Sequence, residues 1–236
     1  MVYDGVKELL SHVRDSGRDV LIITNSSKTA EVNIARLDKM FGLSIDRHYS
    51  SLVSSAQLLR DWVFLRSESR PCRIHLVGAA VDSGLVRDTL AEIVPLEECD
   101  FVLLVSLPDN NRADWLARLR RLDRPVLVPS CDAASVTARG LTTGLGPWVS
   151  DLIASGVDVR NFGKPSTSFY DACNAYWCDG QQPRRVLAVG DQLQTDVVGA
   201  ARYGWSSALV LTGAGTQSRA SSAAASPDYV IQSLRL

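Results

Sequence analysis

Residues Val186–Gly204 read VLAVGDQLQTDVVGAARYG, a short apolar run that passes directly into two aspartates and a helical pattern. The run Val186–Val189 predicts a buried strand, and Thr195–Tyr203 predicts the helix that follows it. Asp191 then lies at the carboxyl end of a strand, where parallel sheets bind ligands. Its carboxylate is the kind of oxygen ligand that Mg²⁺ prefers, and Asp196 is placed to hold the loop or orient the metal's water. Both aspartates also have a simpler interpretation as helix caps.

Apolar runs alternate with helical patterns through the rest of the chain, which favours an α/β fold with a parallel sheet covered by helices. Further strands are predicted at Val20–Thr24, Arg73–Val77, Phe101–Val105, Pro125–Val128, Ala208–Leu211 and Tyr229–Ile231. Helices are predicted at Gly5–Ser16, Val32–Phe41, Leu85–Ile93 and Ala113–Leu122, and the Ser/Ala-rich Ser218–Ser226 is predicted as a surface loop. The middle of the chain, residues 69–158, has enough apolar residues to form a core of its own. We therefore expect a core domain at 1–68 and 159–236 and an inserted domain at 69–158.

The polar loop Thr24-Asn25-Ser26-Ser27 follows the first of these strands and precedes a helical pattern. A hydroxyl group and free backbone N–H groups at a helix N-terminus favour the binding of an anion. The same residue types also make an ordinary N-cap, and the loop alone does not separate the two interpretations.

A second loop, Gly163-Lys164-Pro165, has a glycine that permits a close backbone approach and a proline that favours extended backbone at Lys164. An ammonium group held there would neutralise a phosphate and a neighbouring carboxylate. The alternative is a solvated surface lysine, which is the commoner environment of this residue type.

The composition excludes several classes of protein. The formal net charge of −1 gives no basic face for a nucleic acid. No apolar run reaches the roughly 18–20 residues of a membrane span, and the start MVYDGVKELL lacks the pattern of a secretory signal. The five scattered cysteines indicate reduced thiols in a cytoplasmic protein. A dinucleotide-binding fold is the weakest alternative, because no G-x-G-x-x-G follows a first strand.

Taken in order, TNSS, an inserted domain, FGKP, and VGDQLQTDVVGAARYGWSSALVLTG resemble the haloacid-dehalogenase-like (HAD) superfamily. The chain is similar to class IIA members, the NagD-like phosphatases, and PDYVIQSL near its end fits their closing strand. The resemblance implies a Rossmann-like core with a C2-type cap inserted at 69–158. It also implies a Mg²⁺-dependent phosphatase that acts on a small phosphorylated metabolite.

The resemblance assigns a role to each candidate residue. Thr24 would place its hydroxyl on the transferring phosphoryl group, with Asn25 and Ser26 beside it as phosphate-binding residues. Lys164 would balance the charge between phosphate and nucleophile. Asp191 would be the Mg²⁺ ligand, with Asp196 as its supporting acid. The cap segment Pro129-Ser130-Cys131-Asp132 departs from the family's Asn-Pro-Asp but keeps Asp132, which could contact the substrate.

In the family, the nucleophile and a second acid come from a D-x-D-G segment at the end of a central first strand. The nearest candidate here is Val2-Tyr3-Asp4-Gly5, but Val2 has no nucleophilic atom. The segment YDGVKELLSHVRDSG instead resembles the family's following turn and helix, so Asp4 falls after the motif. The D-x-D strand is therefore expected upstream of Met1.

Three explanations remain open: a start codon assigned too far downstream, a degenerate relative, or replacement of the strand by another segment. The second would be a non-catalytic relative that binds a phosphorylated ligand or serves as a subunit contact. Loss of a middle strand would leave backbone groups of its neighbours unpaired, and a homo-oligomer is one way to cover them. On any of these explanations, catalysis by the 236 residues as printed is not expected.

Overall fold

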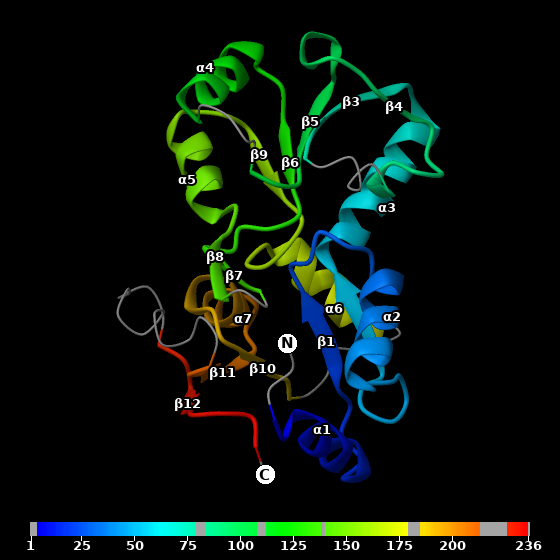
Figure 1. Cartoon of the computed structure of the whole chain (residues 1–236), viewed down its shortest axis with the longest axis vertical. Helices are drawn as coiled ribbons and strands as arrows, with labels where there is room; N and C mark the ends of the chain where they lie inside the picture. Colours follow the sequence, from blue (N-terminus) through cyan, green and yellow to red (C-terminus); the bar gives the residue numbers. More distant parts are fainter. Residues whose placement is uncertain are drawn as a thin grey trace.

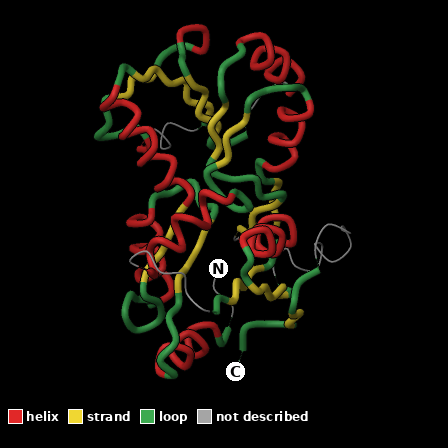
Figure 2. Tube along the Cα trace, turned by 180° about the vertical axis from the view of Figure 1, so that it is seen from behind, coloured by secondary structure: helices red, strands yellow, loops and turns green. Residues whose placement is uncertain are grey.

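A computed structural model of the chain describes residues 4–78, 84–107, 112–137, 140–178, 185–212 and 226–235. It is an elongated α/β protein in which a five-stranded sheet lies at one end and two smaller parallel sheets lie at the other (Figure 1). The view from behind shows the same two groups of elements joined through a narrower middle (Figure 2). No helix within the described ranges is long and apolar enough to cross a membrane. The predicted α/β class is confirmed.

The smaller sheets contain the two ends of the chain. Their elements are α1 (Val6–Asp15), β1 (Leu21–Thr24), α2 (Ala30–Phe41), β2 (Ser51–Ser54), α6 (Thr167–Cys178), β10 (Leu187–Gly190), α7 (Val198–Tyr203), β11 (Ser206–Val210) and β12 (Tyr229–Ile231). β1 pairs with β2, and β11 pairs with both β10 and β12, all in parallel. In each of these sheets, parallel pairing brings the carboxyl ends of the strands to one edge, and Asn25 and Asp191 follow there.

Each of the two smaller sheets ends in strands that pair on one side only among the described residues. Among the described residues, β1 pairs only with β2, and β10 pairs only with β11. Leu187 and Val189 of β10 are 51% and 44% exposed, although their apolar run predicts burial. Side chains of both β1 and β10 pack against the same cluster on α6, so the two sheets lie beside each other across that helix. If a further strand lay between β1 and β10, its absence from the described residues would leave these two edges open. That strand stays a prediction.

The other end is built on one parallel sheet with the order β4-β3-β5-β6-β9. Its elements are α3 (Ser55–Ser69), β3 (Cys72–Val77), β4 (Ala91–Ile93), β5 (Phe101–Leu104), α4 (Arg112–Leu122), β6 (Val126–Val128), α5 (Gly146–Ala154) and β9 (Val159–Asn161). Two apolar clusters cover the two faces of this sheet, as expected for strands that are continuous apolar runs. The predicted boundary at residues 158 and 159 lies at the start of β9, and the division into two domains stays a prediction.

An antiparallel hairpin, β7 (Ala134–Thr137) and β8 (Gly140–Thr143), leaves the five-stranded sheet after β6. Figure 1 shows it extending toward α7 of the other sheet group. A residue just before this hairpin, Asp132, therefore reaches the region of β10. The sequence did not predict this hairpin.

One predicted helix is wrong. Leu85–Ile93 contains β4 instead, which pairs in parallel with β3. Asp88 has a left-handed backbone, with φ of 60°, and this interrupts any helix there. Pro95 also disfavours helical backbone at the residue before it. The predicted helix Thr195–Tyr203 begins instead as a π-helical turn over Leu193–Val197, which leads into α7.

The remaining outcomes concern segments near the chain ends and the thiols. Asp4 lies in the turn before α1 with its side chain 96% exposed and pairs with Arg235, so it takes no part in the site. The predicted loop Ser218–Ser226 lies outside the described residues except for Ser226. Four cysteines are free thiols, namely Cys72, Cys99, Cys131 and Cys173.

Candidate active site

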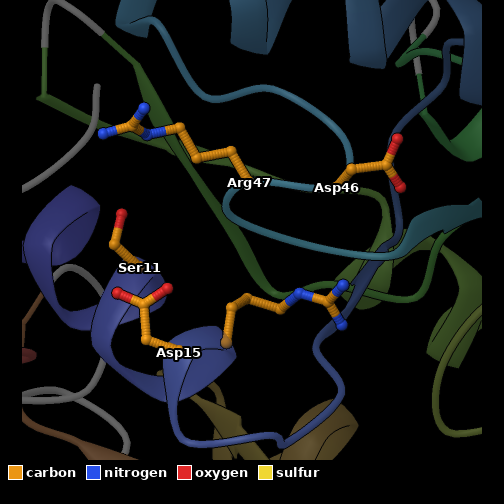
Figure 3. A pocket seen from close by; sticks show the side chains of 5 residues that line it. Ser11, Asp15, Asp46 and Arg47 are labelled. Carbon is orange, nitrogen blue, oxygen red and sulfur yellow. The ribbon is translucent and has the colours of Figure 1, made fainter.

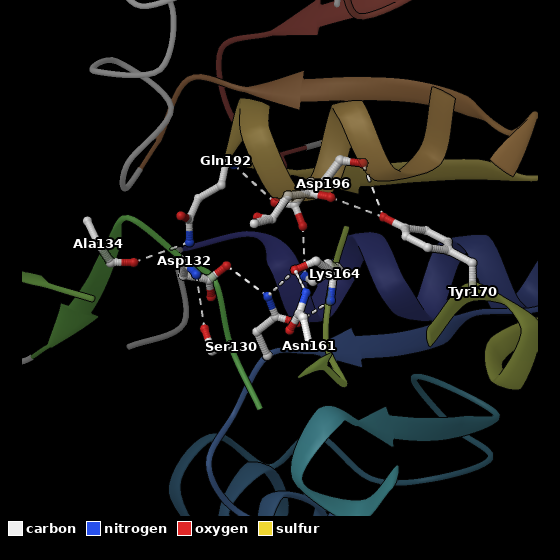
Figure 4. A network of polar contacts seen from close by, with 10 residues as sticks. Ser130, Asp132, Ala134, Asn161, Lys164, Tyr170, Gln192 and Asp196 are labelled. Carbon is white, nitrogen blue, oxygen red and sulfur yellow. Dashed lines mark hydrogen bonds and ion pairs between the residues drawn. The ribbon is translucent and has the colours of Figure 1, made fainter. Parts of the chain in front are cut away.

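Four loops meet where the two sheet groups join, and each follows the carboxyl end of a strand. They follow β1, β6, β9 and β10, and they contribute Asn25, Asp132, Lys164 and Asp196. Figure 4 shows the side chains of Asp132, Lys164 and Asp196 converging in one polar network, and Asn25 joins it through hydrogen bonds to Lys164 and Asp132. Within this network, directly bonded residues lie up to 139 positions apart in the chain.

The Lys164 ammonium is the centre of this network. Its Nζ donates a hydrogen bond to Asp196 Oδ1 at 2.7 Å, and both side chains are only 11% exposed. Burial lowers the pKa of Lys164, but the carboxylates of Asp196, Asp132 and Asp191 outweigh it and hold this pKa above its ordinary value. Lys164 is therefore a buried cation, and the interpretation as a solvated surface lysine is wrong.

Asp196 also holds the loop that precedes it. Its Oδ2 accepts a hydrogen bond from the backbone N–H of Gln192 at 3.0 Å. A Cβ atom at Gly190 would lie 2.2 Å from the same oxygen, so the strand must end in glycine for the carboxylate to pack there. Asp196 thus supports both the ammonium and the loop that carries Asp191.

Asn25 is bound to two other segments. Its Oδ1 accepts from the backbone N–H of Lys164 at 2.7 Å. Its Nδ2 donates to the carbonyl oxygen of Lys164 at 3.1 Å and to Asp132 Oδ1 at 2.9 Å. A Cβ at Gly163 would lie 2.4 Å from Asn25 Oδ1 and from the Pro129 carbonyl oxygen, so glycine is required for this approach.

Asp132 is a largely buried acid beside this amide. Burial raises the pKa of Asp132, while Lys164 and the hydrogen bond from Asn25 act in the opposite direction. The hairpin after it is held by a hydrogen bond from Gln192 Nε2 to the Ala134 carbonyl oxygen at 3.3 Å. Asp132 therefore lies among the other predicted residues, although it follows a strand of the five-stranded sheet.

Ser26 supports the first loop from within. Its hydroxyl donates to Asn33 Oδ1 at 3.1 Å and accepts from the backbone N–H of Lys28 at 3.1 Å. Asn33 donates in turn to the carbonyl oxygens of Lys28 and Thr29. Thr24 is the last residue of β1, next to this loop. The loop has an internally bonded framework ahead of α2, as an ordered anion-binding loop requires.

Three contributors were not predicted from the sequence. Gln192 links Asp196 to the hairpin, and Asn161 donates to the carbonyl oxygen of Gly163 at 2.9 Å. Tyr170 donates to the Thr195 carbonyl oxygen at 3.2 Å, and a Cβ at Gly199 would lie 2.4 Å from its hydroxyl oxygen. Asn161 directly precedes the FGKP segment and could have been considered, but nothing near Tyr170 in the sequence indicates its contact.

The donor set fits a divalent ion only in part. Asp191 directly follows β10 and acts on the Lys164 charge together with Asp132 and Asp196, so carboxylates outnumber the one ammonium. No group of three or more acidic, histidine or cysteine ligands occurs in the part of the chain that is described. Mg²⁺ often takes only one or two carboxylates and completes its shell with water and phosphate oxygens. The residues present therefore suit an ion that shares its ligands with a phosphorylated molecule.

A separate hollow lies away from this network. It has a volume of about 350 Å³ and is lined by Ser11, Arg14, Asp15, Asp46 and Arg47, as Figure 3 shows. None of the predicted site residues lines it. Two arginines are balanced there by two aspartates, so the hollow has no excess charge for an ionic ligand.

Comparison with known proteins gives matches along the whole chain. The HAD-hydrolase-like family model matches residues 161–236. Chronophin from Bos taurus is 26% identical over 98% of this chain and 84% of its own length. A haloacid-dehalogenase-like hydrolase from Brucella suis superimposes with a TM-score of 0.85 at 21% identity, covering 99% of this chain and 90% of that one.

A solved glycerol phosphate phosphatase from Mycobacterium tuberculosis, in complex with calcium, is also similar. Its TM-score is 0.63 at 27% identity, over 89% of this chain and 61% of that one. The matched family segment contains Lys164 and Asp196, which lie in the network of Figure 4, and Asp191, which directly follows β10.

Proposed function

We propose that this chain belongs to the haloacid-dehalogenase-like superfamily, class IIA, and that it forms the phosphate- and metal-binding part of a Mg²⁺-dependent phosphatase. The substrate would be a small phosphorylated metabolite. The observation that carries the proposal is the buried Lys164 ammonium at the junction of the loops after β1, β9 and β10. A buried cation beside a hydroxyl-rich loop is suited to a phosphoryl group.

Each residue has a proposed task. Thr24, with Ser26 in the same loop, would bind phosphoryl oxygens at the end of β1, and Lys164 would neutralise their charge. Asp196 would keep the ammonium in place through its 2.7 Å hydrogen bond. Asp132 would face the remainder of the substrate.

Asp191, supported by Asp196, would hold Mg²⁺, which when bound stabilises negative charge on phosphoryl oxygens. The excess of carboxylates around Lys164 supports a cation at this place. The calcium complex of the glycerol phosphate phosphatase supports it as well.

The nucleophile requires a further segment. No D-x-D pair occurs in the 236 residues, and Asp4 is exposed in a turn. We place the nucleophile on a strand between the open edges of β1 and β10, because its carboxyl end would then lie between Thr24 and Asp191. Such a strand would also cover Leu187 and Val189.

The second candidate is a non-catalytic phospho-ligand-binding or subunit-contact protein. It is favoured by one observation: the Lys164 ammonium already donates to Asp196, so it has a carboxylate partner before any phosphorylated ligand binds. A homo-oligomer that covers the open edges belongs to this alternative. The free thiols are compatible with the cytoplasm, which is the location we propose for either function.

Two experiments separate the candidates. An in-frame D-x-D-G codon set after an apolar run upstream of Met1 would support the enzyme. The 236-residue chain should then be assayed with p-nitrophenyl phosphate and Mg²⁺, beside Asp191→Ala. Loss of a nucleophile costs roughly 10⁴–10⁶ in turnover, so only the extended chain should be active. Rapid Mg²⁺-dependent turnover by the 236 residues, abolished in Asp191→Ala, would mean that another group attacks.

A further inference from the structure

The side-chain amide of Asn25 has no donor left for a ligand. An amide has two N–H donors and one carbonyl oxygen, and here both donors and the oxygen are bound to Lys164 and Asp132. The orientation of the amide is fixed by its partners, since the backbone N–H of Lys164 can only donate. A flipped amide would place its oxygen against a carbonyl oxygen and a carboxylate, which is repulsive.

The environment of Asn25 is built around these bonds. The residue is 9% exposed, and the absent Cβ of Gly163 leaves the space that its Oδ1 occupies. Asn161 holds the same loop from the other side through Gly163 and Lys164. Two asparagines therefore form hydrogen bonds with the Lys164 backbone. Of the two, Asn25 also donates a hydrogen bond to the Asp132 carboxylate.

We infer that Asn25 is a positioning residue, which fixes the Lys164 backbone and the Asp132 carboxylate relative to each other. It joins a loop after β1, a segment that leads out of the five-stranded sheet, and the loop that returns from that sheet. Through these bonds, the position of the buried Lys164 ammonium depends on the segment before the β7–β8 hairpin, because Asp132 of that segment binds the same amide as the Lys164 backbone. This role differs from the phosphate contact that the sequence suggested for Asn25.

Amide exchange of the full 236-residue chain tests the inference without reference to catalysis. In ¹⁵N-labelled protein, Asn25→Ala should speed hydrogen exchange of the Lys164 backbone amide by at least about tenfold, because its acceptor is removed. Exchange of the buried β5 amides, far from the loop, should stay unchanged and shows that the variant is folded. An unchanged Lys164 exchange rate would overturn the inference.

A binding cycle tests the link to Asp132, and this arm rests on the proposed function. Asn25→Ala and Asp132→Ala should each weaken Mg²⁺-dependent binding of inorganic phosphate by about tenfold, and the double variant should lose no more than the larger single loss. Asn161→Ala is the matched control, because it removes an amide that bonds the same loop but, within the described residues, forms no hydrogen bond with Asp132. Its effect should multiply with that of Asp132→Ala.

The outcomes distinguish a positioning residue from a ligand. The inference is overturned if the fold-losses of phosphate affinity from Asn25→Ala and Asp132→Ala multiply in the double variant, as they should in the control. Asn25 would then be an independent phosphate ligand. If the unaltered chain binds no phosphate, the proposed function fails and the exchange result alone decides the role of Asn25. Should Asn25→Ala not fold, Asn25→Asp keeps the acceptor for the Lys164 amide, so that amide should stay protected while phosphate binding is lost.

Discussion

Lys164 Nζ donates to Asp196 Oδ1 at 2.7 Å, although the two residues are 32 positions apart and follow different strands. Both side chains are buried, so each charge depends on the other for stabilisation. The pair therefore contributes to stability as well as to the proposed binding of a phosphoryl group.

Replacing Lys164 with methionine should destabilise the protein by about 3–5 kcal/mol, because the Asp196 carboxylate would stay buried without its cation. Denaturant unfolding at neutral pH measures this loss. The control is Asp151→Asn, which breaks the half-exposed pair of Arg112 and Asp151 and should cost no more than about 1 kcal/mol. Equal losses in the two variants would show that the Lys164 pair is not buried as described.

Gly163→Ala should destabilise the protein by about 1–3 kcal/mol, because a Cβ would overlap Asn25 Oδ1 and the Pro129 carbonyl oxygen. The matched change Gly84→Ala has no atom within 4 Å of the new Cβ and should be nearly neutral. Thermal unfolding of both variants tests this difference. A neutral Gly163→Ala would mean that the loop has room to move away from Asn25.

The pKa of Asp132 gives a pH dependence. Burial raises this pKa in the folded protein, so the folded state holds the proton more tightly than the unfolded chain does. The contribution of Asp132 to stability therefore falls as pH rises through the interval between the ordinary and the raised pKa. Asp132→Asn keeps an acceptor oxygen for Asn25 and should gain stability over the unaltered protein at neutral pH, but not below the ordinary aspartate pKa. A gain that is the same at both pH values would contradict the assignment.

The open edge of β10 gives a fourth prediction. Leu187→Lys should change the stability of the 236-residue chain by less than about 0.5 kcal/mol, since that side chain is half exposed. Leu209→Lys on the neighbouring β11 should unfold it, because Leu209 is 2% exposed. In a chain extended by the proposed upstream strand, Leu187→Lys should become costly. A large loss without that strand would mean that β10 is already covered.

Much of this arrangement could be predicted because strand ends carry local signals. Tyr229–Ile231 was predicted with the bounds of β12, and α2 ends at Phe41, the last residue of the predicted helix Val32–Phe41. The polar residues after β1 and β10 could be selected because parallel sheets bind ligands at the carboxyl ends of their strands. Their type and place in the chain were enough to select them.

The partners of those residues could not be predicted, because they depend on packing between distant segments. Nothing near Asn25 indicates that its amide would bind the Lys164 backbone 139 positions away. β2 was missed because SLVS is short and half polar, and it forms a strand only beside β1. β4 was mistaken for a helix because a three-residue strand is specified by pairing with β3 more than by its own pattern.

Calorimetric titration of the 236-residue chain with inorganic phosphate tests the central claim most directly, with and without Mg²⁺, and in Lys164→Met and Asp191→Ala. The proposed site predicts binding that requires Mg²⁺ and weakens by at least about tenfold in each variant, as loss of a charge-assisted contact should cause. Phosphate that fails to bind the unaltered chain, or that binds equally well to both variants, would contradict it.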